Sequence, residues 1–598
     1  MSDIFFKHGY SDLHFDRSQF NFSKKDWIVE FQKSKFEILL RRNDKRDIWE
    51  PVVDPDGISI YLIGRITLNE KSWNLATQLS GNGGLACKYI FYLLKEYGLD
   101  ALPNYLNGAF AVFISNFKGE NYVITDRMGF TPIYYKCQKD CITLSSYLDA
   151  LDSKYDENLD LVSLGEYLNY GRVEHPNTYY KKVKQLDPGS IYKISDQSIS
   201  KIKTYYTFKF KWRGEKPKQL IEELKDAINI SVYERTLPIL GKSGIFLSGG
   251  MDSRGILASA RQPSEIVTST FYDEINAEYE TAHEIAKRYK STHIGLQRTK
   301  EHYIKNSPDS VNLMSGQWSV LEGHYTGFID KILDLDVDNW LTGCFADWMF
   351  KGLASNTRYL KIFGKNIPTI KRLDKFNSVY YKPKFDMTNP ELNIEIEKRK
   401  HTVLKDIYNY KAEEFDWNIE RTRLFPMNRE PDMGSRHILA RVLRWDPVLA
   451  DNRLIELFER IPVSQKLENY IWGNAIAKIC RGNNDIKDNN WGARVDANNY
   501  QRIFSFLKEN IRRKLSNKNS KSVGNVSTTG SWPNYYRVTL ESEVLPIIWK
   551  SLNKDSFDTI EKITGMNYQK MSYLDIAKQN LEYFYRILTI LIWLDRKI

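Results

Sequence analysis

Cysteine is scarce in this sequence of 598 residues, and the few cysteines are scattered along it. Because their number is odd and no closely spaced pair has a histidine nearby, we exclude a disulfide framework and a zinc site. Thiols of this kind are typical of a reducing cytosol, which is the compartment that we expect. The cysteines are Cys87, Cys137, Cys141, Cys344 and Cys480.

The sequence also lacks a long hydrophobic run. The longest one near its end, Ile587 to Leu594, is far shorter than the ~20 residues that a membrane-spanning helix needs. The amino-terminal residues have neither the basic region nor the apolar core of a secretory signal. We therefore expect a soluble, cytoplasmic protein that does not bind a membrane.

Positive charge is in only slight excess. The net charge of +11 favours anionic partners such as nucleotides or acidic peptides, but over so long a chain it is typical of an ordinary basic protein. Segment 510–531 is basic and then rich in serine, threonine and glycine, which predicts a loop. Because this segment has no interleaved aromatic residues, we do not expect the protein to bind nucleic acid.

A chain of this length cannot form one core, so we expect two domains. Up to about residue 210, short alternating runs such as 58–64 are separated by turn signals and predict a strand-rich domain. From about 215, strands such as 265–272 alternate with helices such as 277–290, which predicts a parallel sheet covered by helices. Beyond about 400 the chain is mostly helical. The predicted domains are 1–212 and 213–598.

Two adjacent glycines follow the apolar run GIFLS, in the stretch Ser248-Gly249-Gly250-Met251-Asp252-Ser253. A glycine pair lets the backbone turn sharply and approach a ligand, and a following helix directs N–H groups at an anion. The two serines add hydroxyl donors. Because Asp252 would repel a bare phosphate, we predict that Mg²⁺ mediates the contact. No Walker pattern lies here, and a tight turn capped by serines is the alternative interpretation.

This stretch resembles the S-G-G-x-D-S loop of the asparagine synthetase family. Members of that family cleave ATP between its α and β phosphates, adenylate a carboxylate and let an amine attack the acyl-adenylate. The resemblance implies ATP and Mg²⁺ as cofactors. Three further stretches follow in the family's order: 276–286, LTGCFADWMFKG at 341–352, which resembles S-G-x-G-A-D-E-x-F-G-G, and RWDPVLADNRLIEL at 444–457, which resembles a region written P-F-L-D.

The amino-terminal half is similar to the glutaminase-like domain of the same family, on the evidence of residues 105–135 and 186–194. The resemblance implies an Ntn-like β-sandwich of the class II glutamine amidotransferase type. A PP-loop ATP pyrophosphatase domain of the adenine nucleotide alpha hydrolase type, with a parallel sheet and a helical extension, would follow it. The resemblance covers about 60–460.

The resemblance also implies which residues form the site. Asp252 and Asp347 would hold Mg²⁺ and take part in catalysis. A site that expels pyrophosphate needs a cation, and the family's lysine falls at Asn474 here, so we expect Lys466 or Lys478 in its place. Other cations near the motifs are Lys351, Arg441 and Arg444. The nucleotide would be bound by Leu247, Ser248, Gly249, Gly250, Asp252, Ser253, Phe271 and Gly343.

Two departures from the family pattern bear on the activity. The family's glutaminase uses a cysteine directly after the initiator Met, whereas this chain has Ser2, and the Asn-Gly-Glu of the glutamine pocket reads Ile63-Gly64-Arg65. A thiolate is a far better nucleophile near neutral pH than a hydroxyl, so we predict that the domain does not hydrolyse glutamine. Trp348 follows Asp347 where asparagine synthetases have an acid, which argues against ordinary asparagine formation.

We therefore predict a carbon–nitrogen ligase that adenylates a small-molecule or peptide carboxylate for attack by an amine. β-Lactam synthetases and lasso-peptide cyclases also lack the cysteine, and a protein like the cyclases would act on a precursor peptide beside a partner processing enzyme. Two alternatives stay open. One is asparagine synthetase proper or a polysaccharide-associated amidotransferase, and the other is a binding or scaffold protein that keeps the fold without the chemistry.

Overall fold

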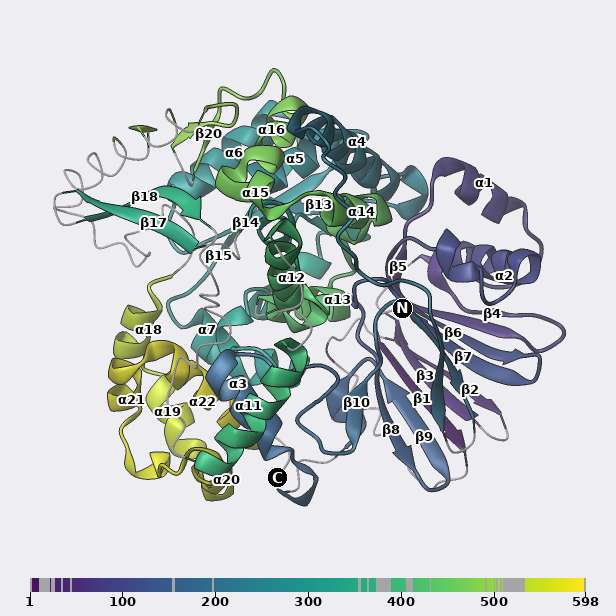
Figure 1. Cartoon of the computed structure of the whole chain (residues 1–598), viewed down its shortest axis with the longest axis horizontal. Coiled ribbons are helices and arrows are strands. Elements are labelled where there is room, and N and C mark those ends of the chain that lie inside the picture. The colour runs from purple at the N-terminus through teal and green to yellow at the C-terminus, as the bar shows by residue number, and fades with distance from the viewer. Residues whose placement is uncertain are drawn as a thin grey trace.

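The amino-terminal strands gather at one end of the molecule and the carboxyl-terminal helices at the other, as Figure 1 shows. The computed structural model describes residues 3–595 apart from short and long gaps, and Ser2 and the predicted loop at 510–531 lie outside the described residues. The gaps are 10–21, 23–26, 34–35, 43–45, 153–155, 196–197, 353–355, 363–364, 373–388, 405–411, 431, 490–491, 499–500, 502–503, 506–507 and 509–532.

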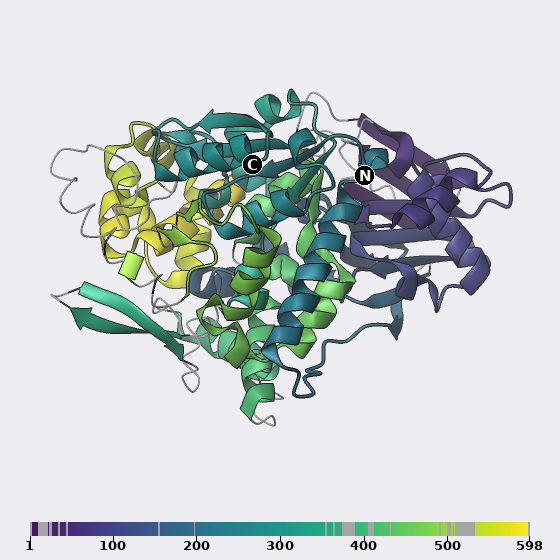
Figure 2. The same cartoon turned by 90° about the horizontal axis from the view of Figure 1, so that it is seen from above.

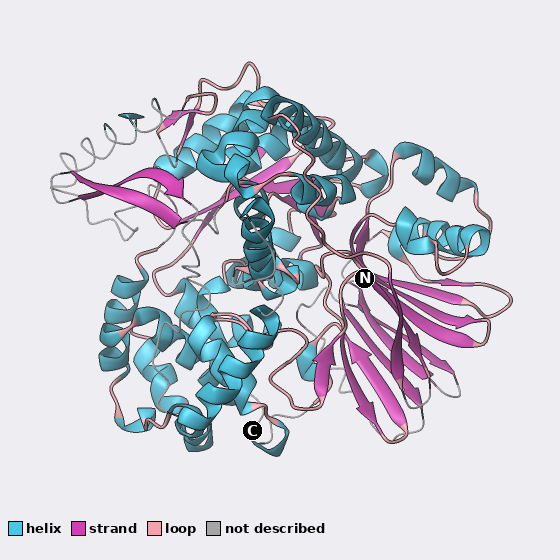
Figure 3. Cartoon of the chain, viewed as in Figure 1, coloured by secondary structure: helices cyan, strands magenta, loops and turns pink. Residues whose placement is uncertain are grey.

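Two antiparallel sheets of six strands each pack face to face in the amino-terminal part (Figure 3). Their strand orders are β10-β8-β9-β1-β3-β2 and β12-β11-β7-β6-β5-β4. Side chains alternate between the faces of each strand, so Ile4 and Phe6 of β1 meet Tyr61 and Ile63 of β5 in a fully buried layer. The strands are β1 (Asp3–Gly9), β2 (Trp27–Lys33), β3 (Phe36–Arg42), β4 (Val52–Val53), β5 (Ser59–Ile66), β6 (Gly108–Phe117), β7 (Glu120–Thr125), β8 (Tyr134–Gln138), β9 (Cys141–Ser145), β10 (Val183–Gln185), β11 (Ser190–Ile194) and β12 (Ile199–Thr204).

Helices cover the outer face of the second sheet. The other side chains of β5, Ile60 and Leu62, pack in one cluster with Ile90 and Leu94 of α2. The helices here are α1 (Glu70–Gln78) and α2 (Leu85–Tyr97), and the second of them ends at Gly98. The predicted sandwich is therefore confirmed, with one face against helices and one against the other sheet.

A parallel sheet of five strands in the order β15-β14-β13-β16-β19 forms the centre of the second part. Helix α5 packs on β13 and β16, α6 packs on β14 and β15, and α4 and α16 pack on α5 and on each other. The predicted strand–helix alternation is confirmed. Its elements are α4 (Pro217–Arg235), β13 (Ser243–Phe246), α5 (Met251–Ser259), β14 (Val267–Tyr272), α6 (Ala277–Arg288), β15 (Thr292–Gln297), β16 (Asn339–Thr342), β19 (Trp445–Pro447) and α16 (Tyr470–Ile479).

The strand order decides where a ligand can bind. Because β13 and β16 are parallel neighbours, the loops that follow them leave the sheet side by side at its carboxyl-terminal edge. These are the loops that begin at Leu247 and Gly343. In open α/β sheets ligands bind in the crevice at this edge, so the sheet brings together the two loops that the sequence singles out.

The remaining helices surround this sheet and extend from it. Helix α3 (Leu161–Tyr170) lies among helices from the end of the chain, where Leu164 and Leu168 share a buried cluster with Leu591 (Figure 1). The hairpin of β17 (Asn356–Ile362) and β18 (Lys365–Arg372) projects from the body in both Figure 1 and Figure 2. The other elements are α7 (His302–Lys305), α8 (Ser307–Leu313), α9 (Ile329–Leu333), α10 (Ala346–Phe350), α11 (Pro390–Leu404), α12 (Ala412–Leu424), α13 (Met433–Val442), α14 (Asn452–Arg460), α15 (Val463–Lys466), β20 (Lys487–Asp488), β21 (Ala493–Arg494), α18 (Tyr535–Glu541), α19 (Leu545–Ser551), α20 (Lys554–Thr564), α21 (Tyr573–Gln579) and α22 (Leu581–Asp595).

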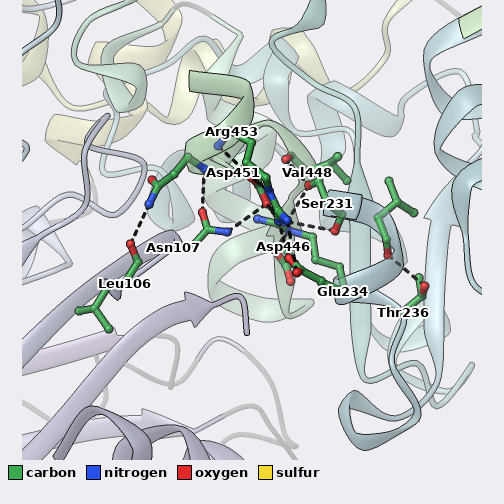
Figure 4. A network of polar contacts seen from close by, with 12 residues as sticks. Leu106, Asn107, Ser231, Glu234, Thr236, Asp446, Val448, Asp451 and Arg453 are labelled. Carbon is green, nitrogen blue, oxygen red and sulfur yellow. Dashed lines mark hydrogen bonds and ion pairs between the residues drawn. The ribbon is translucent and has the colours of Figure 1, made fainter. Parts of the chain in front are cut away.

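A buried ionic network ties the two parts together (Figure 4). Arg235, at the end of α4, donates to Asp446 at 2.8 Å and to Asp451 at 3.1 Å, and its side chain is fully buried. Asn107 donates to the same Asp451 at 3.0 Å from the amino-terminal part. Burial raises the pKa of Asp451, but Arg453 and Arg235 lower it by more than burial raises it. The resulting pKa is about 2. Both aspartates of the 444–457 stretch are thus bound by arginines near this junction.

Replacing Arg235 by methionine should destabilise the fold by about 3–5 kcal/mol, because two buried carboxylates would lose their partner. Denaturant unfolding measures this, with Arg288→Met as the control, since Arg288 pairs with Asp485 at an exposed site worth about 0–1 kcal/mol. The pKa of Asp451, about 2, is below its unfolded value of about 3.9, so its contribution is present above about pH 4 and disappears as the pH falls to 2. Equal unfolding midpoints for the two variants would contradict this account of the junction.

Candidate functional site

The turn after β13 is preorganised by its own serines. Ser253 Oγ accepts a hydrogen bond from the Ser248 backbone N–H at 3.0 Å and lies 3.0 Å from Ser248 Oγ. The N–H of Gly250 donates to Ser248 Oγ at 3.3 Å, and α5 begins directly after Gly250. The first turn of a helix has N–H groups without partners in the helix, so this end of α5 suits an anion. The two serines thus hold the turn by bonding to each other and to its backbone, while Gly250, the N-cap residue of α5, has no side-chain cap.

Asp252 and Asp347 meet at one cation, the ammonium group of Lys351. Lys351 Nζ is 2.6 Å from Asp252 Oδ2 and 2.9 Å from Asp347 Oδ1. Asp347 lies in the first turn of α10 and Lys351 directly after this helix, so the two are one helical turn apart. Burial raises the pKa of Asp252, and Lys351 opposes that shift. The structure thus brings together the two acids that the sequence predicts as metal ligands.

Trp472 fixes the orientation of Asp252 from the other side. The indole Nε1 donates to Asp252 Oδ1 at 2.8 Å, while the ring stacks on Phe350 with centroids 5.5 Å apart. Trp472 belongs to α16, which packs on α5, and it is buried. Sequence reasoning missed this residue because an indole is not a usual ligand type and Trp472 is far from Asp252 along the chain. The packing of α16 on α5 is what brings it there.

The two glycines at Gly249 and Gly343 are needed for close contacts. A Cβ on Gly249 would lie 2.7 Å from the Cβ of Asn489, whose backbone N–H donates to the Gly249 carbonyl at 3.0 Å. The segment that carries Asn489 is held by Arg254, which donates to the carbonyls of Ile486 and Lys487. A Cβ on Gly343 would lie 2.8 Å from Ile256 and 3.5 Å from Asp252. The second loop therefore lies directly against the first.

The strand ends beside the turn form an aromatic wall. Phe271, at the end of β14, lies 5.5 Å from Phe246, 5.3 Å from Tyr325 and 5.5 Å from Phe328, measured between ring centroids. The Leu247 N–H donates to the Ser269 carbonyl and its carbonyl accepts from Thr270, so both backbone groups of this predicted contact already have partners in the sheet. Aromatic surface of this kind suits a purine, whose flat face stacks on rings.

Charged side chains lie near Cys344, which follows Gly343 in the second loop. The thiol of Cys344 is 2.9 Å from Thr342 Oγ1; burial raises its pKa and the nearby guanidinium of Arg436 opposes the shift. Glu322, whose pKa is raised to about 7 mainly by burial, lies 4.0 Å from Arg436. Glu430 is buried beside them, and burial raises its pKa as well. These charged groups adjoin the aromatic wall, since Arg436 also opposes the rise that burial causes in the pKa of Tyr325.

The cations predicted for pyrophosphate lie in different places. Lys466 is completely buried in an ion pair with Glu420, and the exposed Lys478 pairs with Glu222 at 2.5 Å. Arg441 lies 3.4 Å from Asp3, and Arg444 donates to the Val337 carbonyl at 2.8 Å. Of the cations that the sequence singles out, Lys351 is the one that the structure pairs with both Asp252 and Asp347.

The corner between the Ser248–Ser253 turn and the loop of Asp347 and Lys351 has side chains that fit Mg²⁺. Two carboxylate oxygens from separate loops converge on one positive charge, and carboxylate oxygens are the ligands that Mg²⁺ prefers. The ammonium group of Lys351 contacts both acids in this structure, and Asp252 and Asp347 are the residues that would hold the metal. No group of three or more histidine, cysteine or acidic side chains that could hold a metal ion occurs within the described residues, so phosphate oxygens and water would complete a Mg²⁺ shell.

Comparisons with known proteins identify two domains in the chain. A family model described as a glutamine amidotransferase domain matches residues 86–206, and one described as asparagine synthase matches residues 223–480. Asparagine synthetase [glutamine-hydrolyzing] 1 of Bacillus subtilis (strain 168) is 30% identical over 215 residues, which are 34% of this chain and 33% of that protein. The match thus spans about a third of the length of this relative.

Two solved structures align with about half of the chain at low similarity. The allosteric regulatory enzyme of purine biosynthesis has a TM-score of 0.24 and 11% identity, and the alignment covers 49% of this chain and 80% of that one. Glutamine phosphoribosylpyrophosphate amidotransferase from B. subtilis, complexed with ADP and GMP, has a TM-score of 0.25 and 11% identity over 49% of this chain and 90% of that one. On the two family models and the curated relative, the chain has a glutamine amidotransferase domain followed by an asparagine synthase domain, and it is similar to the asparagine synthetase family.

Proposed function

We propose that this protein is an ATP-dependent carbon–nitrogen ligase that adenylates a substrate carboxylate and releases AMP and pyrophosphate. The observation that carries the proposal is the convergence of Asp252 and Asp347 on a single cation beside the Ser248–Ser253 turn. Mg²⁺ bound there would neutralise phosphate charge during the displacement. Similarity to the asparagine synthetase family supports ATP-dependent amidation in general.

Each group of side chains at this site would have its own role in binding the nucleotide. The aromatic wall around Phe271 would hold the adenine, while the Ser248–Ser253 turn and the start of α5 would hold the β and γ phosphates. Trp472 would keep Asp252 in one orientation when the carboxylate exchanges its cation. The carboxylate and the amine would then bind near Cys344 and Arg436. A small molecule or the carboxyl group of a precursor peptide fits this scheme.

We also propose that the amino-terminal domain does not supply ammonia from glutamine. Arg65, which replaces the acid of the family's glutamine pocket, is buried and donates to the Asp338 carbonyl at 3.0 Å, across to the second part of the chain. Asp3, the residue after Ser2, also forms structural ion pairs, with Arg41 at 2.9 Å and with Arg441 at 3.4 Å. Both positions thus serve contacts within and between the domains.

Asparagine synthetase itself, or an amidotransferase of polysaccharide assembly that uses glutamine or ammonia, is the second candidate. The observation in its favour is the 30% identity with the glutamine-hydrolysing enzyme of B. subtilis. A protein that binds but does not react is the third. Two acids held against one cation at a preformed turn argue against a degenerate site.

Substituting Asp252 by asparagine tests the adenylation chemistry. We expect AMP formation from ATP to fall by about 100-fold or more, because the site loses one of two carboxylates that hold the metal. AMP is measured with α-labelled ATP, hydroxylamine as a trapping amine, and a panel of amino acids and short peptides as carboxylates. Asp330→Asn, an exposed acid of α9, is the control and should form AMP like the unmodified protein. AMP formation by Asp252→Asn at the control rate would refute the metal role.

Glutamine hydrolysis separates the first two candidates. Incubated with L-glutamine, the unmodified protein should release no glutamate above the uncatalysed rate. Ser2→Cys should be equally inactive, because Arg65 still stands in place of the acid of the pocket, so restoring a thiol does not restore the site. Steady glutamate release by the unmodified protein would favour the glutamine-using candidate.

A further inference from the structure

Lys351 departs from the family pattern at the centre of the site. In LTGCFADWMFKG, aligned with S-G-x-G-A-D-E-x-F-G-G, Lys351 takes the place of the first glycine of the closing pair. The side chain that this substitution adds is 14% exposed and turns back over one helical turn to Asp347. It also reaches Asp252 on the other loop. The lysine is therefore built into the corner between the two metal-binding acids.

The charges explain why this position suits a lysine. Two carboxylates that converge on one point repel each other unless a cation lies between them. Lys351 Nζ lies between these two, 2.6 Å from Asp252 Oδ2 and 2.9 Å from Asp347 Oδ1, and it neutralises part of the acid pair. Asp252 is partly buried and Asp347 is exposed, so the lysine joins an inner and an outer carboxylate.

If Asp252 and Asp347 hold Mg²⁺ as proposed, the ammonium group would have to move when magnesium ATP binds. Lys351 and Mg²⁺ cannot occupy one point, so the lysine would leave at least one carboxylate. Its flexible four-carbon stem allows a short movement, and phosphates held at the Ser248–Ser253 turn would be its new anionic partners. The other lysines considered for pyrophosphate already pair with acids elsewhere: Lys466 with Glu420 and Lys478 with Glu222.

We propose that Lys351 is the pyrophosphate-binding cation of this protein and that, without nucleotide, it occupies the metal position between Asp252 and Asp347. The inference rests on the proposed function of this corner as the site for magnesium ATP. Lys351 would exchange two carboxylates for phosphate oxygens as the metal and nucleotide bind. It would then neutralise the charge that develops on the departing pyrophosphate. Its role in catalysis would thus be to contact the leaving pyrophosphate.

The test compares how Mg²⁺ and pyrophosphate bind when the lysine is removed. The variants are Lys351→Met, which keeps the length and loses the charge, and Lys351→Arg, which keeps the charge. Lys225→Met is the matched control, because Lys225 also pairs with two acids, Glu222 at 2.9 Å and Asp226 at 3.2 Å, on the surface of α4. Thermal unfolding is followed with and without Mg²⁺, and titration calorimetry measures the binding of magnesium pyrophosphate and of magnesium ATP.

We expect Mg²⁺ alone to leave the unfolding midpoint of the unmodified protein almost unchanged, because Lys351 already holds the acids. Lys351→Met should unfold at a lower temperature without metal, and Mg²⁺ should restore its midpoint. Its affinity for magnesium pyrophosphate should fall by about 10- to 100-fold, as expected for the loss of a hydrogen bond between charged groups. Lys351→Arg and Lys225→Met should resemble the unmodified protein in both measurements.

Other outcomes separate the inference from the function on which it rests. If the unmodified protein binds magnesium ATP and Lys351→Met shows the same Mg²⁺ response and pyrophosphate affinity, the role of Lys351 is refuted and the function stands. If the unmodified protein binds neither ligand, the proposed function fails. If Lys351→Met does not fold, Lys351→Met/Asp347→Asn removes the unpaired acid as well. That double variant should fold without metal and bind pyrophosphate about 10-fold or more weakly than Asp347→Asn alone, and equal affinities would refute the inference.

Discussion

The site depends on one electrostatic constraint, which is that a partly buried carboxylate and an exposed one converge on a single cation. Asp252 comes from the helix after β13 and Asp347 from the short helix after β16, and both contact Lys351. Without a cation the two carboxylates would repel each other, and with one they form a place where cations can be exchanged. The proposed chemistry uses that exchange, since a phosphate-bound metal brings its own positive charge to the same oxygens.

The fold supplies this corner by pairing elements that are distant in the sequence. Parallel pairing of β13 with β16 places the two loops side by side, and the lack of a side chain at Gly343 lets the second loop lie against Ile256 and Asp252. Helix α16 brings Trp472 to the far side of Asp252. Arg235 of α4 donates hydrogen bonds to Asp446 of β19 and to Asp451. Asp451 also accepts a hydrogen bond from Asn107 of the amino-terminal part. The corner is therefore held by both parts of the chain.

Much of this arrangement could be predicted from the sequence, and the exceptions have physical causes. The β13–α5–β14–α6 alternation has clear periodicity, and the Ser248–Ser253 turn has a recognisable spacing, so both were predicted. The three-residue strand β19 is too short for periodicity to indicate. Lys351 was recognised as a nearby cation, but its pairing with Asp347 depends on the five-residue helix α10, which has no sequence signal of its own. Trp472 acts through an indole N–H, a group that spacing patterns do not mark as a ligand.

The central claim is that one cation position is shared by Asp252, Asp347 and either Lys351 or a metal. A crystal structure with ATP and Mn²⁺ tests it most directly, because anomalous scattering locates the manganese independently of the nucleotide. The account predicts a manganese peak bound by both aspartates, with Lys351 turned to the phosphates at the Ser248–Ser253 turn. A peak that touches neither aspartate, or phosphates bound away from this turn while Lys351 stays between the acids, would contradict it.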